Sequence, residues 1–230
     1  GVPICEDIWM DNVCMELKDQ GCELIISPNG SPFDKYKINQ RKTIIEDRVT
    51  EVKIPFVYVN QFGGQDELVF DGSSLVMNGS KEVVFEAPSW EENTSVIEFN
   101  VSEKKFNDLP FNKAKVSDLE NIYMATVIGL RDYVAKNNFP GVILGLSGGI
   151  DSAFCAAVAV DALGKDKVNV YMLPSVYTSK NSLDDAKDCA KRLEIHLDSI
   201  PISNTFLSLE DSLEELFKGL PTDITEENLQ

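Results

Sequence analysis

The chain has 230 residues, of which 43% are hydrophobic and 26% are charged, a composition that argues against a wholly disordered chain. Its formal net charge is −17, and the acidic excess is shared almost equally by the two halves of the chain. A surface of this sign repels polyanions, so we expect no broad binding of nucleic acid or of an anionic membrane. No apolar run reaches the roughly 18–20 residues of a membrane span.

The first hundred residues predict alternating helices and strands, from apolar periodicity and from the glycines and prolines between apolar runs. In chain order we expect a strand end at 1–5, a helix at 11–20, a strand at 23–27 and a turn at 28–32. A helix at 36–53 and a strand at 54–60 follow, and then a turn at 63–64, a hairpin at 68–79 and a strand at 82–86. Residues 101–117 contain few apolar runs and are typical of a linker.

After the linker the pattern changes to alternating helices and buried strands. The expected helices cover residues 119–134, 153–163 and 184–193, and the expected strands cover 142–146, 168–173 and 195–202. This order predicts a parallel sheet with helices on its faces. We therefore expect one domain over 1–100, a linker over 101–117 and a second domain over 118–230.

The cysteines and the single histidine restrict the chemistry. Five cysteines with irregular spacing and no CxxC pair indicate reduced thiols in a cytoplasmic protein. His196 stands in an alternating apolar stretch, where we expect a structural strand residue. With one histidine in the chain, a zinc site built on a histidine cluster is excluded.

The most specific motif is the run Ser147-Gly148-Gly149-Ile150-Asp151-Ser152, between an expected buried strand and an alanine-rich helix. Two glycines let the backbone expose its N–H groups, and the start of a helix adds partial positive charge, so together they favour an anion. Asp151 can hold a Mg²⁺ ion that bridges phosphate oxygens. The plain alternative is a glycine turn in which Asp151 and Ser152 only cap the helix. The complete string favours phosphate binding, although it is not a Walker loop.

This string resembles the pyrophosphate loop of the ATP pyrophosphatases, and more of the same half resembles the NAD synthetases within that group. The segments 173–186, 200–202 and 225–230 share this resemblance. Val176 and Glu194 depart from the family pattern, where arginine and glycine are usual. The resemblance implies that ATP is bound by Gly145, Leu146, Ser147, Gly148, Gly149, Ile150, Asp151 and Ser152, with Mg²⁺ held by Asp151.

The first residues resemble a second family. Gly1-Val2-Pro3-Ile4-Cys5-Glu6-Asp7-Ile8-Trp9 is similar to the nucleophile segment of nitrilase-superfamily amidases, which use a Glu–Lys–Cys triad. By its sequence alone, Cys5 is more typical of a buried apolar filler than of a nucleophile. The resemblance implies that Cys5 is the catalytic thiol, while Cys14 and Cys22 are expected to be structural.

The segment from Asn29 to Lys37 resembles the glutamine pocket of glutamine-dependent NAD synthetases. The resemblance implies that Ser31 and Lys37 bind glutamine, and a cation at Lys37 suits an α-carboxylate. Without it, a turn serine and a solvated lysine are the simpler interpretation. Segment 58–72 is also similar to the family, and we expect strands and contact loops there.

Together the resemblances imply an α/β chain: the C-terminal part of a nitrilase-like α-β-β-α sandwich, then the start of a Rossmann-like parallel-sheet ATP-pyrophosphatase domain. The implied reaction is the ATP-dependent amidation of deamido-NAD, with ammonia from glutamine. The substrates would be glutamine, ATP and deamido-NAD, and we expect a homo-oligomer. The amidase Glu and Lys are not in the chain, so we expect part of a longer enzyme that is inactive when expressed alone.

Two other functions stay open on the sequence. One is a different amidotransferase with the same ATP loop, such as a GMP or asparagine synthetase, although their glutaminase domains are built differently around the nucleophile. The other is a non-catalytic nucleotide-binding remnant.

Overall fold

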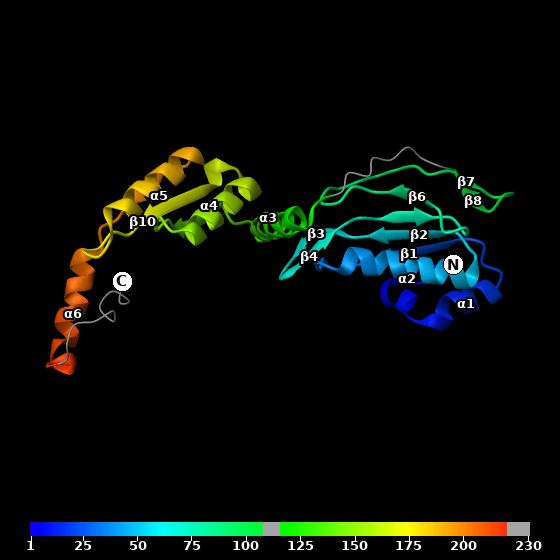
Figure 1. Ribbon diagram of the computed structural model, residues 1–230, viewed down its shortest axis with the longest axis horizontal. Helices are drawn as coiled ribbons and strands as arrows, with labels where there is room; N and C mark the ends of the chain where they lie inside the picture. Colours follow the sequence, from blue (N-terminus) through cyan, green and yellow to red (C-terminus); the bar gives the residue numbers. More distant parts are fainter. Residues whose placement is uncertain (108–115, 220–230) are drawn as a thin grey trace. The chain divides into compact units, whose positions relative to one another are not determined.

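The computed structural model describes residues 1–107 and 116–219. The chain divides into two compact units, Gly1–Tyr133 and Val134–Gln230, and the boundary falls inside helix α3 (Asp118–Lys136) (Figure 1). Residues 108–115 of the expected linker and the expected helix start at 222–230 lie outside the described residues.

The first unit is built on a four-stranded mixed sheet. Its strand order is β1 (Ile25–Asn29), β2 (Phe56–Asn60), β5 (Leu75–Met77) and β6 (Val83–Glu86). Strands β1 and β2 are parallel, and the other two pairs are antiparallel. Helix α1 (Asp11–Asp19) and helix α2 (Lys37–Val52) lie together on one side of this sheet (Figure 1). Both helices and β2 fall within the ranges that the periodicity predicts, whereas β1 begins two residues after the predicted start at 23 and extends through Pro28 and Asn29, where a turn was expected.

Alternation along the strands explains the main core. In β2, Phe56 and Tyr58 are fully buried, while Val59 on the opposite face is exposed. They pack in one cluster with Ile45 and Val49 of α2. Because the helix and the strands bury apolar residues at their own periods, one helical stripe and one sheet face close on each other.

A hairpin forms where a turn was expected, and the predicted hairpin at 68–79 is wrong. Strands β3 (Phe62–Gln65) and β4 (Leu68–Asp71) pair antiparallel, and β5 pairs with β2 instead of β4. Gly63 and Gly64 therefore lie in a strand. A Cβ on Gly64 would crowd the α3 backbone at Ile128 and Gly129, so the glycine allows close packing.

The first part of the expected linker is structured. Strands β7 (Phe99–Asn100) and β8 (Lys105–Phe106) pair antiparallel, and Phe106 is buried. The Asn78 side chain donates to the Phe106 carbonyl at 3.1 Å and accepts from its N–H at 2.7 Å. One buried amide thus satisfies both backbone groups of Phe106.

The second unit confirms the predicted parallel sheet. Its strand order is β11 (Leu197–Ser199), β10 (Val168–Met172) and β9 (Val142–Gly145), with all pairs parallel. Its helices are α4 (Ile150–Leu163), α5 (Lys180–Arg192) and α6 (Ser203–Phe217), and α4 and α5 both contact β10. Short 3-10 helices lie at Cys5–Trp9 (η1) and Lys165–Lys167 (η2).

Two expectations in this unit were wrong. Helix α5 begins before the predicted residue 184, because Ser179 caps it by accepting a hydrogen bond from the Ser182 N–H at 3.1 Å. His196 is exposed, just before the short strand β11, and its Nε2 lies 3.0 Å from Asp198 Oδ1. It is therefore not a structural strand residue.

We predict that Asn78→Ala loosens the β7–β8 pair, because it leaves the buried N–H and C=O of Phe106 without partners. The expected loss is about 1–3 kcal/mol of stability. Hydrogen–deuterium exchange of peptides covering residues 99–107 in the full-length protein should accelerate, while peptides from α4 serve as the internal control. Unchanged exchange at 99–107 would contradict the anchoring role of Asn78.

Candidate functional site

Cys5 stands at the first position of η1 in a strained conformation. Its φ is +48°, in the left-handed region that non-glycine residues rarely adopt. The η1 turn is held by the Ile4 N–H, which donates to Asp7 Oδ2 at 2.8 Å, and by Ile8, which is fully buried. The thiol is half-buried and free of any disulfide. Strain that the surrounding structure enforces on a nucleophilic side chain is typical of functional positions.

Lys37 reaches the same short helix. It is the first residue of α2, and its Nζ lies 4.7 Å from the centre of the Trp9 ring at the end of η1. A cation over an aromatic face is attracted by the ring electrons. The structure thus brings the expected glutamine-binding lysine to the helix that carries Cys5.

Ser31 lies behind these residues in a buried polar network. It is 7% exposed and follows β1 directly. Its Oγ accepts from Arg41 Nε at 3.0 Å, and its N–H donates to Asn60 Oδ1 at 3.0 Å. Arg41 in turn forms a two-pronged ion pair with Asp71, at 2.8 and 2.9 Å. Ser31 is therefore fixed by partners on α2 and β2.

Tyr58 connects this network to the cysteine. It is 1% exposed on β2. Burial raises the pKa of Tyr58, while Arg41 and Ser31 lower it and the nearby Cys5 raises it further. The net shift is upward, so the Tyr58 hydroxyl stays protonated at neutral pH.

Four members of this network were not predicted from the sequence: Arg41, Asp71, Asn60 and Tyr58. A signal for Arg41 was present, because it lies one helical turn before Ile45 on the buried stripe of α2. Charged side chains at such positions are buried only when paired. Asp71 carried no comparable signal, since its partner is 30 residues away in the sequence.

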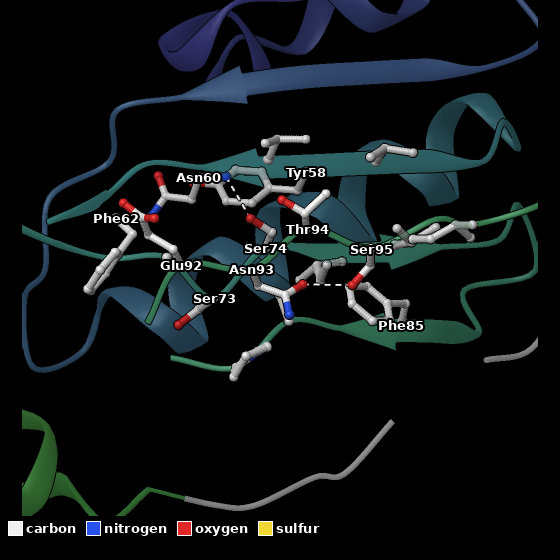
Figure 2. Close-up of a pocket in the computed structure, with 18 of the residues that line it drawn as sticks. Tyr58, Asn60, Phe62, Ser73, Ser74, Phe85, Glu92, Asn93, Thr94 and Ser95 are labelled. Atoms are coloured by element: carbon white, nitrogen blue, oxygen red, sulfur yellow. Dashed lines mark hydrogen bonds between the residues drawn. The ribbon is translucent and has the colours of Figure 1, made fainter. Parts of the chain in front are cut away.

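A pocket of about 500 Å³ lies over the same sheet (Figure 2). Tyr58, Asn60 and Ser74 line it from the strands and their connections, and Glu92 and Asn93 line it from the segment after β6. Among the described residues, the lining contains no Lys, Arg or His, and Cys5, Ser31 and Lys37 do not belong to it. The carboxylates of Glu91 and Glu92 give the described part of the lining a negative charge.

The expected phosphate loop lies where it was predicted, between β9 and α4. Gly149 is the residue before α4, with φ −83° and ψ 159°, and the Ser152 hydroxyl donates to its carbonyl at 3.0 Å. Ser147 Oγ accepts from the Gly149 N–H at 3.2 Å and lies 3.1 Å from Ser152 Oγ. Leu146 is fully buried, while Gly145, Ile150 and Asp151 are exposed.

Gly148 allows the loop to touch the next helix. Its φ is +86°, and a Cβ there would overlap the carbonyl of Ser182 in α5. The start of α5 therefore packs directly on the loop at the start of α4. Two helix N-termini meet at the carboxyl edge of β9 and β10, and each contributes partial positive charge.

Asp151 is the acidic residue in the first turn of α4. It is exposed and has no hydrogen-bond or ion-pair partner among the described residues. Within residues 1–107 and 116–219, no group of three or more His, Cys, Asp or Glu side chains could hold a metal ion alone. A Mg²⁺ ion at Asp151 would need oxygens from its substrate, which is the usual way proteins bind this ion.

Cys14 and Cys189 are poor candidates for a second nucleophile. All five cysteines are free of disulfides. Burial raises the pKa of the Cys14 thiol, and burial likewise raises that of Cys189. A raised pKa disfavours the reactive thiolate.

No helix of the described segments combines the length and apolar character needed to cross a membrane.

Comparison with family models divides the chain in two. Residues 1–104 match the carbon-nitrogen hydrolase family, and residues 122–230 match the NAD synthase family. The first match contains Cys5, Ser31 and Lys37, and the second contains the loop at 145–152. These matches confirm the expected α/β fold, with a nitrilase-like part followed by a parallel-sheet NAD synthetase part.

Whole-chain relatives carry both parts. The chain is 42% identical to the glutamine-dependent NAD(+) synthetase of Rhodobacter capsulatus and 41% identical to that of Acinetobacter baylyi, in each case over its whole length and 42% of the relative. A solved structure of the Acinetobacter baumannii enzyme in complex with ADP matches with a TM-score of 0.92 and 40% identity, covering 43% of that protein. The Cytophaga hutchinsonii enzyme shares the fold with a TM-score of 0.77 at 17% identity.

The chain thus spans less than half the length of these relatives. It combines a carbon-nitrogen hydrolase segment with an NAD synthase segment, and over its whole length it is similar to glutamine-dependent NAD(+) synthetases.

Proposed function

We propose that the protein is a glutamine-hydrolysing NAD synthetase. It would amidate deamido-NAD with ammonia released from glutamine, and it would convert ATP to AMP and pyrophosphate. The observation that carries this proposal is that one chain contains two sites of different chemistry. One is the Cys5 thiol on a strained backbone, and the other is the glycine-serine loop at the start of α4. The similarity to glutamine-dependent NAD(+) synthetases over the whole chain supports it.

At the first site, the Cys5 thiolate would attack the side-chain amide carbon of glutamine. The C–N bond then breaks, ammonia leaves and a thioester remains, which water hydrolyses to glutamate. Lys37 and Ser31 would hold the substrate, the lysine by its charge and the serine by its hydroxyl. Arg41 fixes the serine by donating to its hydroxyl oxygen.

At the second site, the N–H groups from Ser147 to Ser152 would bind the phosphates of ATP, aided by the helix starts that meet there. The deamido-NAD carboxylate attacks the α-phosphorus and pyrophosphate leaves; ammonia then attacks the acyl carbon and AMP leaves. Mg²⁺, when bound, supplies positive charge for the pyrophosphate, and Asp151 would hold it. The ADP complex of the Acinetobacter baumannii relative supports nucleotide binding.

We also propose that the protein works in the cytoplasm as a homo-oligomer, with glutamine, ATP and deamido-NAD as its small-molecule partners. The five free cysteines support a reducing compartment.

Cys5→Ala in the full-length protein should abolish NAD formation from glutamine, because the thioester can no longer form. NAD formation from ammonium salt should remain, since the loop at α4 is untouched. Both rates are measured by coupling NAD to a dehydrogenase. Loss of both activities in a folded variant would contradict the assignment of two separate sites.

Gly148→Ala should lower ammonia-driven NAD formation by about a hundredfold, because the new Cβ pushes the loop away from Ser182 and misplaces the phosphates. Gly164→Ala is the matched control. Gly164 has a similar φ of +80° at the far end of α4, but a Cβ there meets nothing within 4 Å. Equal losses in the two variants would assign the effect to backbone strain alone.

Asp151→Asn keeps the shape of the side chain but removes its charge. Synthesis from glutamine and from ammonia should both fall by about two orders of magnitude or more, because the metal and the leaving pyrophosphate lose a charged ligand. Glutamine hydrolysis at Cys5, measured as glutamate release, should be less affected. Ammonia-driven turnover within about threefold of the parent, roughly 0.7 kcal/mol, would refute this role.

A further inference from the structure

We infer that Arg41, clamped by Asp71, is the positioning residue of the glutamine site: it sets the place and orientation of Ser31 without touching the substrate itself. The inference rests on the proposed glutaminase function of Cys5. The buried ion pair of Arg41 and Asp71, on elements that follow Cys5 in the sequence, would thus determine how glutamine is held.

Every nitrogen of the guanidinium group is engaged. Arg41 is 2% exposed. Its Nε donates to Ser31 Oγ at 3.0 Å, and its Nη2 donates to the carbonyl oxygens of Ser31 and Pro32 at 2.7 and 3.0 Å. Its Nη1 donates to both carboxylate oxygens of Asp71. Three of the five hydrogen bonds therefore fix the segment of Ser31 and Pro32, and the other two join Arg41 to Asp71.

Asp71 fixes the arginine and balances its charge. The carboxylate is fully buried and also accepts from Ser73 Oγ at 2.7 Å. A buried guanidinium without a counter-charge is strongly unfavourable. Asp71 lies at the end of β4, so the hairpin β3–β4 positions the clamp and α2 positions the arginine.

The clamp orients the Ser31 hydroxyl. A hydroxyl oxygen has two lone pairs and one proton. Arg41 Nε donates to the Ser31 oxygen and so occupies one of its lone pairs. The Ser31 proton therefore points away from the guanidinium group, which suits donation to a carboxylate or carbonyl oxygen of glutamine. On the other side Asn60 holds the Ser31 backbone, with its Nδ2 donating to the Ser31 carbonyl at 3.2 Å.

The chain offers a matched control on the same helix. Arg48 lies two turns after Arg41 on the buried face of α2 and is 4% exposed. It binds the Met10 carbonyl at 3.0 Å and the carboxylates of Asp11 and Glu51, not the Ser31 segment. A lysine at either position keeps the positive charge but lacks the planar guanidinium group with its several N–H donors.

The test compares Arg41→Lys with Arg48→Lys in the full-length protein. Arg41→Lys should raise the KM for glutamine about tenfold and leave kcat within about threefold, because it weakens binding in the ground state and the transition state alike. Ammonia-driven NAD formation should not change. Arg48→Lys should lower the unfolding temperature without changing the glutamine KM. A folded Arg41→Lys protein with a glutamine KM within about twofold of the parent would overturn the inference, as would an equal rise in both variants.

A double-mutant cycle separates positioning from general damage. If Arg41 acts through Ser31, then Ser31→Ala alone raises the glutamine KM, and adding Arg41→Lys to it raises KM by less than about twofold more. Additive effects, or an unchanged KM in Ser31→Ala, would overturn the inference.

If Arg41→Lys fails to fold, Asp71→Asn takes its place, because it keeps the size of the clamp and removes its charge. A folded Asp71→Asn protein should show a raised glutamine KM, and an unchanged KM would overturn the inference. If the full-length protein without any substitution releases no glutamate from glutamine, both the proposed function and this inference are overturned. Normal turnover in the parent combined with an unaffected Arg41→Lys variant would overturn this inference alone.

Discussion

Parallel strand pairing is the constraint on which both units depend. Parallel neighbours require a crossover between them, so their carboxyl ends meet at one edge of the sheet. In the first unit this edge gathers Ser31, after β1, and Asn60, at the end of β2. In the second it gathers the loop after β9 and the start of α5 after β10. Polar groups that are far apart in the sequence become neighbours because they follow parallel strands that end at the same edge of the sheet.

The elements that sequence predicted well are those that local pattern determines. Helices α2 and α3 follow apolar positions at helical spacing, β9 is a continuous apolar run, and β10 is apolar except for Asn169. The loop over residues 147–152 lies between a strand and a helix, as its glycines and serines indicated. In each case the information lies within a window of a few turns.

The failures have a different origin. Gly63 and Gly64 are typical of a turn, yet they form a strand because α3 packs against them too closely for a Cβ, and Asp132 accepts from the Gly64 N–H at 2.7 Å. The Arg41–Asp71 pair joins residues 30 positions apart, so no local pattern reveals it. The roles of Cys5, Ser31 and Lys37 came from resemblance, and they stay predictions; the structure adds their surroundings.

The strain at Cys5 lies in its backbone and not in its thiol. A side chain with φ near +48° costs roughly 1 kcal/mol relative to glycine. Replacement by alanine would keep this cost because the Cβ remains, and only glycine would relieve it. The turn holds this conformation through residues that follow Cys5, the Asp7 carboxylate bonded to the Ile4 N–H and the buried Ile8.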